Sequence, residues 1–199
     1  DVTAEGDAAR MVAAANRAFG PVDLVIANAG GAESAPFRAT DAALWSRMIG
    51  LNLTGAYATV HAALGDVTRP TGDGALRRII FVASTAGMKG YPYVAAYVAA
   101  KHGVVGLMRA LAAELAATPV TVNALCPGFT DTPMLAASVA AIAGKTGRGE
   151  AEARAMLARA NPQGRLITPE DVAATALWLC SPGASAITGQ AIAIAGGEI

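Results

Sequence analysis

Short, predominantly apolar runs recur along the chain at 24–27, 78–83, 120–125 and 190–195. Each run is too short for an ordinary helix. None of them shows the regular alternation of polar and apolar side chains that marks a strand with one face in water. Uninterrupted apolar runs of this length are typical of parallel strands covered on both faces, so we expect a parallel sheet between two layers of helices.

Helical periodicity fills most of the intervals between these runs, at 4–19, 41–64, 94–117, 150–160 and 169–180. The last of these helices has the clearest start. Thr168 can cap it, Pro169 suits its first position, and Asp171 completes the spacing of a capping box. Alternating strands and helices predict a layered α/β fold with right-handed crossover connections.

The less regular stretch at 133–164 is expected to be an insertion that covers the substrate, because Gly144, Gly147 and Gly149 divide two helical segments there. The Pro- and Gly-rich stretch at 69–74 is expected to be a surface loop before a strand. Neither stretch resembles a linker between domains. We therefore expect one domain over residues 1–199.

Composition excludes several classes of protein. Of the 199 residues, 54% are hydrophobic and only 15% are charged, which is unlike a disordered chain. The 15 basic and 15 acidic residues cancel, so no bulk field attracts nucleic acid or an anionic membrane. Cys126 and Cys180 suggest no disulfide framework, and no apolar run or leader suggests a membrane or export, so we expect a cytoplasmic protein with a small-molecule substrate.

Tyr97 and Lys101 are the first candidates for chemistry. They are four residues apart in a helical pattern, which places the ammonium beside the phenol on one face. A neighbouring cation favours the phenolate, so we expect the pKa of Tyr97 to fall toward the range useful in acid–base catalysis. An ordinary surface pair with the same spacing is the alternative.

Small and polar residues follow three of the predicted strands. Ser84 ends one apolar run, Asn28-Ala29-Gly30 ends another, and Pro127-Gly128 follows a third. The carboxyl ends of parallel strands meet at one edge of a sheet, where open α/β sheets bind ligands. We therefore expect these segments to converge on one crevice beside Tyr97.

Other kinds of site fit the sequence poorly. Gly144-Lys145-Thr146 looks like the end of a nucleotide phosphate loop, but Val139 stands where that loop needs its first glycine. His61 and His102 have no carboxylate or Cys at metal spacing, so no metal site is predicted. Ser84 lies in no Gly-x-Ser-x-Gly turn, which argues against a serine hydrolase.

Taken together, these segments resemble the short-chain dehydrogenase/reductase family, over residues 1–197 and in the family's order. The matching motifs are Asp1-Val2-Thr3, Asn28-Ala29-Gly30, Asn52-Leu53-Thr54-Gly55, Ser84, Tyr97-Val98-Ala99-Ala100-Lys101, Pro127-Gly128-Phe129-Thr130-Asp131-Thr132 and the segment 165–173. The chain looks most similar to 3-oxoacyl-thioester reductases, 3-hydroxyacyl-CoA dehydrogenases and polyketide ketoreductases. The resemblance implies a Rossmann-type, doubly wound parallel sheet in a three-layer α/β/α fold. It also implies an oxidoreductase that interconverts a secondary alcohol and a ketone, with a 3-hydroxyacyl or 3-oxoacyl thioester as substrate.

The resemblance also implies a role for each catalytic residue. Tyr97 would exchange a proton with the substrate oxygen, and Ser84 would hydrogen-bond that oxygen. Lys101 would lower the pKa of Tyr97 and bind the nicotinamide ribose. Asn52 would hold a water that links Lys101 to solvent, although an amide that binds only helix backbone is the alternative for this residue.

The cofactor implied is NAD or NADP, with the choice between them open. Its adenosine and phosphate side would meet Asp1, Asn28, Ala29 and Gly30. Its nicotinamide side would meet Tyr97, Lys101, Pro127, Gly128, Thr130 and Thr132. Met88, Tyr91 and Met134 are the candidates for the substrate wall, and a homodimer or homotetramer is expected.

The chain departs from the family pattern at its beginning. No Gly-x-x-x-Gly-x-Gly or Gly-x-Gly-x-x-Gly follows a strand, so we expect a partial domain without its N-terminal strands and glycine-rich phosphate turn. The strand at 24–27 would then be an uncovered edge. Two alternatives stay open: a catalytically silent binding or assembly module, and a sugar-nucleotide epimerase or dehydratase, which shares Tyr-x-x-x-Lys but usually has a longer substrate domain.

Overall fold

A computed structural model describes residues 1–70 and 76–199. Its centre is a four-stranded sheet in the order β1-β2-β3-β4, with every neighbouring pair parallel. The strands are β1 (Leu24–Ala27), β2 (Arg77–Val82), β3 (Val120–Pro127) and β4 (Ala191–Ile194). The strands lie side by side in the order in which they occur along the chain. Because they are parallel, each connection runs from the end of one strand to the start of the next and contains at least one helix. The predicted parallel α/β sheet is confirmed.

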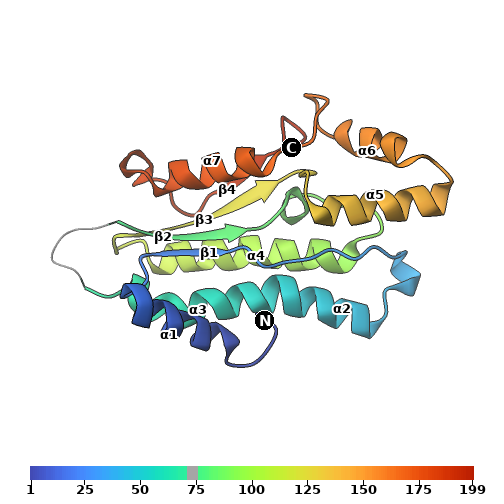
Figure 1. Ribbon diagram of the computed structural model, residues 1–199. Coiled ribbons are helices and arrows are strands. Elements are labelled where there is room, and N and C mark those ends of the chain that lie inside the picture. The colour runs from blue at the N-terminus through green and yellow to red at the C-terminus, as the bar shows by residue number, and fades with distance from the viewer. Residues whose placement is uncertain (71–75) are drawn as a thin grey trace.

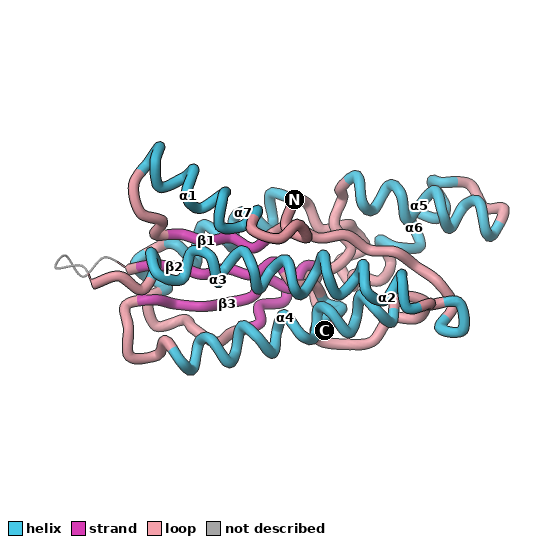
Figure 2. Tube along the Cα trace, turned by 90° about the horizontal axis from the view of Figure 1, so that it is seen from below, coloured by secondary structure: helices cyan, strands magenta, loops and turns pink. Residues whose placement is uncertain are grey.

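Helices lie on both faces of this sheet (Figure 1). One face is covered by α1 (Asp7–Phe19), α3 (Gly55–Val67) and α4 (Ala95–Glu114), which Figure 2 shows from below. The opposite face carries α7 (Pro169–Cys180). The remaining helical segments are α2 (Ala42–Ile49), α5 (Pro133–Thr146), α6 (Glu150–Ala158), and the short turns η1 (Phe37–Ala39), η2 (Gly50–Thr54), η3 (Thr85–Gly87) and η4 (Pro182–Ala184).

The core forms because β2 and β3 are apolar on both faces. Ile79 and Phe81 are fully buried against α3 and α4, together with Met108. Ile80, between them on the strand, points to the other face and packs with Leu179 of α7. Successive side chains of a strand alternate between faces, so a run without polar interruption must be covered twice.

The expectation of burial on both faces is wrong for β1. Val25 and Ala27 are buried, whereas Leu24 and Ile26 are 44% and 43% exposed. Within residues 1–70 and 76–199, the sheet ends at β1, and no hydrophobic cluster includes these two outer side chains. Within the described residues β1 is therefore an edge strand, and no helix layer covers the face that carries Leu24 and Ile26.

The helix boundaries differ from the predicted ones by a few residues, and one predicted helix has an irregular centre. The helix expected at 41–64 runs on to Val67 and contains a π-helical turn, η2, that includes Asn52. Periodicity does not reveal a single inserted residue of this kind. The stretch 133–164 forms α5 and α6, separated at Gly147, whose φ of 71° favours glycine.

The capping box at α7 is confirmed. Asp171 N donates to Thr168 Oγ1 at 3.1 Å, and Thr168 N donates to Asp171 Oδ2 at 2.9 Å. The loop expected at 69–74 falls largely on residues 71–75, which lie outside the described residues. Over the rest of the chain, no helix has the length and hydropathy needed to cross a membrane, and no three His, Cys, Asp or Glu side chains cluster at metal-binding distance.

Two buried arginines at the start of β2 tie the sheet to the helix layers. Arg78 is 3% exposed, and its guanidinium donates to the carbonyls of Leu179 and Ser181 at 2.7 and 3.1 Å. These carbonyls belong to the last turn and the C-cap of α7, where no intrahelical donor remains. Arg77 likewise pairs with Asp23 and donates to the carbonyl of Arg69.

Replacing Arg78 with Met should therefore destabilise the fold. The loss expected is about 3 kcal/mol, because two buried carbonyls at the end of α7 would lose a charged donor. Urea unfolding followed by circular dichroism measures it. Arg17→Met, in the exposed last turn of α1, is the matched control and should change the free energy of unfolding little. Equal stability of Arg78→Met and Arg17→Met would contradict this role for Arg78.

Candidate active site

The carboxyl ends of the strands meet at one edge of the sheet. Asn28 follows β1, Ser84 follows β2, Gly128 follows β3, and Gly196 follows β4. The edge lies near α2 and α5 rather than near the turns at the opposite ends of the strands (Figure 1). Polar groups from four segments distant in sequence are thereby brought to a common surface.

Ser84 is held by local backbone geometry and by the tight packing of η3. Its hydroxyl accepts a hydrogen bond from Ala86 N at 3.1 Å, which starts the short helix. Within that helix, a Cβ on Gly87 would lie 2.7 Å from the carbonyl oxygen of Lys101. Glycine thus lets η3 rest directly on α4, which places Ser84 against Tyr97 in the first turn of that helix.

Lys101 lies one turn after Tyr97 on α4 and is 4% exposed. Its Nζ donates to the carbonyl of Val82 at 2.9 Å and lies 5.6 Å from the centre of the Tyr97 ring. Burial lowers the pKa of Lys101 to about 8, and nearby Cys126 acts in the opposite direction. The ammonium is thus fixed between the end of β2 and the phenol.

The expected fall in the Tyr97 pKa is not what this structure shows. Burial raises the pKa of Tyr97, and the Ser84 hydroxyl, which acts to lower it, is the weaker influence. A phenolate in this enclosed position would lose more hydration than its neighbours replace. Tyr97 therefore keeps its proton at neutral pH, which suits a proton donor.

Asn52 is 1% exposed in the π turn and binds backbone groups. Its Nδ2 donates to the carbonyls of Gly31 and Met48 at 2.9 and 3.0 Å, and its Oδ1 accepts from Gly31 N at 3.1 Å. A Cβ on Gly30 would lie 2.8 Å from Asn52 Oδ1 and 3.5 Å from Lys101 Nζ. Asn52 therefore fixes the loop after β1 beside the ammonium, whereas the water-holding role expected for it stays a prediction.

The loop after β3 is shaped by its own hydroxyls. Gly128 N donates to the carbonyl of Ile194 at 3.0 Å, which continues the pairing of β3 with β4 beyond Pro127. Thr130 Oγ1 donates to the carbonyl of Gly128 at 3.0 Å, and Thr132 caps α5. These residues form a turn at the edge of the sheet. The hydroxyls of Thr130 and Thr132 hold this turn through their hydrogen bonds to the backbone.

Other predicted binding residues lie less centrally. Asp1 is exposed, and its carboxylate accepts hydrogen bonds from Thr3 N and Thr3 Oγ1. Asn28, Ala29 and Gly30 are exposed in the loop after β1. Met88 and Met134 are 40% and 43% exposed.

Tyr91, the third candidate for the substrate wall, is instead partly buried. Its hydroxyl lies 2.7 Å from Thr85 Oγ1 and 2.5 Å from Glu198 Oε1. Sequence reasoning did not identify Thr85 or Glu198. The available signal was their placement, because Thr85 follows Ser84 directly, and Glu198 is a charged residue just past the Gly196-Gly197 turn at the end of β4.

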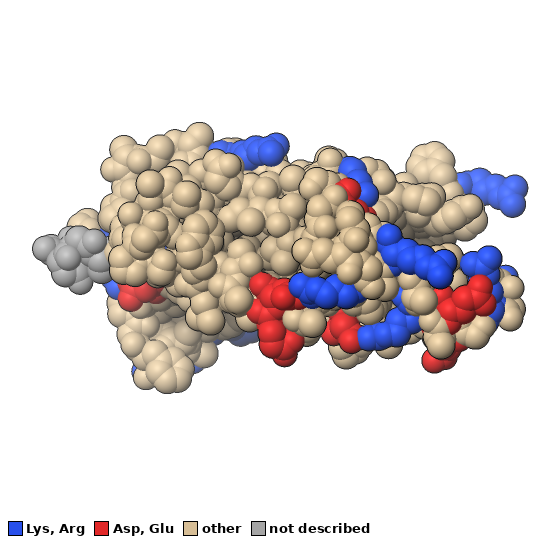
Figure 3. All heavy atoms as spheres, turned by 90° about the horizontal axis from the view of Figure 1, so that it is seen from above, with Lys and Arg blue, Asp and Glu red and all other residues tan. Residues whose placement is uncertain are grey.

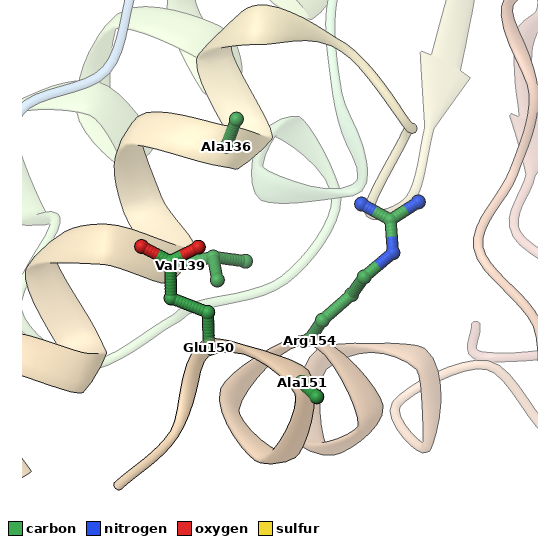
Figure 4. A pocket seen from close by; sticks show the side chains of 5 residues that line it. All are labelled: Ala136, Val139, Glu150, Ala151 and Arg154. Atoms are coloured by element: carbon green, nitrogen blue, oxygen red, sulfur yellow. The ribbon is translucent and has the colours of Figure 1, made fainter.

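A separate cleft lies between α5 and α6. It has a volume of about 250 Å³ and is lined by Ala136, Val139, Glu150, Ala151 and Arg154 (Figure 4). The Arg154 guanidinium points toward the loop after β3, where it pairs with Asp131. In Figure 3, acidic and basic side chains lie side by side on the right-hand part of this face, whereas its left-hand part is largely uncharged. The cleft contains none of the predicted catalytic residues.

The sheet edge fits the nicotinamide and ribose half of a dinucleotide. Gly30 and Gly128 pack closely against Asn52 Oδ1 and Glu198 Oε2, which a Cβ at either position would approach to 2.8 and 3.1 Å. Beside them, the Lys101 ammonium and the Tyr97 phenol are donors suited to ribose hydroxyls. The residues present would therefore hold the nicotinamide ribose between the loops after β1 and β3.

Comparison with known proteins gives a consistent result. Residues 1–198 match the family model described as "Enoyl-(Acyl carrier protein) reductase". A putative ketoacyl reductase of Streptomyces coelicolor is 38% identical over 99% of this chain and 75% of its own length. A D-beta-hydroxybutyrate dehydrogenase of Rhizobium meliloti is 34% identical over 99% of this chain and 75% of its own length.

The solved structures agree with the sequence comparison. An actinorhodin polyketide ketoreductase with NADPH superposes with a TM-score of 0.92 at 35% identity, covering all of this chain and 75% of that chain. A sorbitol-6-phosphate 2-dehydrogenase of Erwinia amylovora gives a TM-score of 0.91 at 30% identity, with 100% and 77% covered. The Rossmann-type fold, the class of enzyme and the nicotinamide cofactor class expected from the sequence are those of these proteins' family. This chain belongs to the short-chain dehydrogenase/reductase family of nicotinamide-dependent oxidoreductases, which includes the ketoacyl reductases and the hydroxybutyrate dehydrogenase that it resembles.

Proposed function

We propose that this protein reduces the ketone of a 3-oxoacyl thioester to the 3-hydroxyacyl thioester, with NADH or NADPH as the reductant. The observation that carries the proposal is the enclosed arrangement of Ser84, Tyr97 and Lys101 at the carboxyl end of β2. Relatives named ketoacyl reductases support the choice of substrate.

The bound nicotinamide would supply the hydride to the carbonyl carbon. Tyr97 would donate its phenol proton to the carbonyl oxygen, a role that suits a phenol whose pKa is raised by burial. The Ser84 hydroxyl, at the adjacent strand end, would donate a hydrogen bond to the same oxygen as negative charge develops there. The protonated phenol is the form that can supply this proton at neutral pH.

Lys101 has two tasks in this proposal. Its ammonium would stabilise the Tyr97 phenolate left after proton transfer, because 5.6 Å separates Nζ from the ring centre in a site with little water. It would also donate to the ribose hydroxyls beside Gly30. Asn52 would keep the loop after β1 in place through its hydrogen bonds to Gly31. A proton from solvent would then reach Lys101 along this loop.

A direct assay tests the proposal. The protein is incubated with NADH or NADPH and the N-acetylcysteamine thioester of 3-oxobutanoate, and nicotinamide absorbance is followed. A simple ketone without the thioester is the matched substrate. We expect kcat/KM for the thioester to be about tenfold higher or more, because recognition of the acyl thioester adds contacts that the ketone lacks.

Two results would contradict the proposal differently. Equal rates with both substrates would leave the ketone reductase and reject the thioester. Absence of nicotinamide oxidation with any ketone, together with no change of nicotinamide fluorescence on mixing, would favour the silent binding module instead. Ser84→Ala, which removes one hydroxyl from the site, should lower the rate with either substrate.

A further inference from the structure

A charged cluster that the mechanism does not use lies beside the proposed substrate site. It consists of Lys89 and Tyr91 from the segment after η3, Thr85 from η3, and Glu198 from the turn after β4. The Glu198 side chain is 5% exposed, whereas that of Lys89 is 37% exposed. A carboxylate buried to this degree requires compensating partners.

Glu198 obtains these partners through one oxygen. Lys89 Nζ lies 3.0 Å from Oε1, and the Tyr91 hydroxyl lies 2.5 Å from the same oxygen. A phenol has a single proton, and the charged acceptor is the stronger one, so Tyr91 donates to Glu198 rather than outward. Lys89 also lies 5.0 Å from the centre of the Tyr91 ring, which holds the ammonium over the phenol.

The other oxygen of Glu198 lies against the end of β3. Oε2 is buried and has no hydrogen-bond partner among the described residues. It lies 3.1 Å from where a Cβ on Gly128 would be, at the end of β3. Tyr91 also lies close enough to Tyr97 for the charge of Tyr97 to act on the Tyr91 phenol. The cluster therefore borders the place where the substrate ketone would meet Tyr97.

This arrangement disfavours a substrate that carries its own carboxylate. Besides Lys101 and the reacting hydroxyls, which the proposed reaction uses, the groups of this cluster that could bind such an anion are the phenol proton of Tyr91 and the ammonium of Lys89. Glu198 already holds both of them. Its second oxygen adds negative charge that would repel an incoming carboxylate in a region with little water.

We propose that Glu198 makes the site select neutral ketones over 3-oxo acids with a free carboxylate, by occupying Tyr91 and Lys89. This inference rests on the proposed ketone reductase activity and specifies its substrate class. A thioester or ester of a 3-oxo acid has no negative charge next to the ketone and is accepted by the site, whereas the free acid is repelled.

A matched pair of substrates tests the inference. These are 3-oxobutanoate and its ethyl ester, which differ by the charged carboxylate and are assayed with the same nicotinamide. The protein should reduce the ester with the higher kcat/KM. In Glu198→Gln, the ratio of kcat/KM for the acid to that for the ester should rise about tenfold to a hundredfold, the value of a charge-assisted hydrogen bond released to the substrate.

Two further variants show whether the mechanism of selection is the one described. Glu198→Gln combined with Lys89→Gln should bring the ratio back toward that of the unmodified protein, because the ammonium that would bind the acid is gone. Glu114→Gln removes an exposed carboxylate in the last turn of α4, about 25 Å along the helix from Tyr97, and should leave the ratio unchanged.

A spectroscopic readout is independent of turnover. Burial raises the pKa of Tyr91, and the hydrogen bond to Glu198 raises it further. Absorbance titration of the tyrosines in Glu198→Gln should therefore show one phenol ionising at lower pH, and that phenol should be missing in Tyr91→Phe. An unshifted titration would overturn the contact on which the inference depends.

The outcomes separate the two proposals. Reduction of the ester by the unmodified protein supports the proposed function whatever happens with the acid. Equal kcat/KM for acid and ester in the unmodified protein overturns the role of Glu198 without any variant, even if Glu198→Gln does not fold. An unchanged ratio in a folded Glu198→Gln also overturns it. Failure to reduce either compound rejects the proposed function, and the selectivity with it.

Discussion

Replacing Tyr97 with Phe should lower kcat by about a hundredfold to ten-thousandfold, the range that a positioned acid or base contributes. The phenol proton is the one that the proposed reaction transfers to the ketone oxygen. Phe keeps the ring that packs in the first turn of α4 and removes only the hydroxyl. The affinity for the nicotinamide should change little, since most of its contacts lie elsewhere on the sheet edge.

Stopped-flow and steady-state assays measure this effect, and fluorescence titration measures nicotinamide affinity separately. Tyr93→Phe is the matched control, because Tyr93 is 65% exposed and loses the same hydroxyl four residues earlier. It should retain nearly normal kcat. Near-normal turnover by Tyr97→Phe would exclude Tyr97 as the proton donor and leave Ser84 as the remaining hydroxyl at the strand end.

Replacing Lys101 with Met should lower kcat/KM by about a hundredfold to a thousandfold, which is typical when one preorganised donor is removed from a reaction site. Two effects combine here: the phenolate loses its cation, and the ribose loses a donor. Unlike Tyr97→Phe, this variant should therefore also weaken nicotinamide binding. Fluorescence titration distinguishes the two variants, and unchanged affinity in Lys101→Met would contradict the ribose contact.

The fold should tolerate the loss of Lys101. Burial holds the pKa of this ammonium at about 8, below its ordinary value of 10.5. Between these two pH values, Lys101 keeps its proton in the unfolded chain and has lost it in the folded protein. The free energy of unfolding should therefore rise as pH increases from about 8 to 10.5. Urea unfolding across this range should show a shallower rise in Lys101→Met than in the unmodified protein. An identical pH dependence in both would contradict a buried charge at this position.

The outer face of β1 carries two exposed apolar side chains that can promote association between protein molecules. Leu24 and Ile26 lie on an edge strand, and apolar edge strands favour association between chains. Each variant should therefore be compared with the unmodified protein at the same concentration and aggregation state, measured by light scattering.

Much of the fold could be predicted from the sequence because its signals are local. The apolar runs identified all four described strands, and the spacing of Thr168 and Asp171 identified the start of α7. The same locality placed Tyr97 and Lys101 on one face of α4, since residues four apart on a helix are neighbours wherever the helix lies. These features need no knowledge of what packs around them.

Details within the elements were less accessible. The π turn around Asn52 keeps the helical hydrophobic pattern on either side, so periodicity shows one long helix. Burial of β1 depends on what covers each face of the sheet, and the composition of Leu24–Ala27 is as apolar as that of the covered strands. Sequence alone therefore predicted the strand but not its exposed face.

The site, too, has some features that were predictable from the sequence and others that were not. The sequence was enough to predict the order of strands and helices along the chain, the residues that follow each strand, and the placement of Tyr97 beside Lys101. Only the tertiary structure decided that Arg78 closes α7 across 101 residues, that Glu198 holds Tyr91 across 107, and that burial raises the pKa of Tyr97. The physical reason is that periodicity and capping act over a few residues of chain, whereas desolvation and long-range hydrogen bonds depend on which segments the assembled sheet brings together.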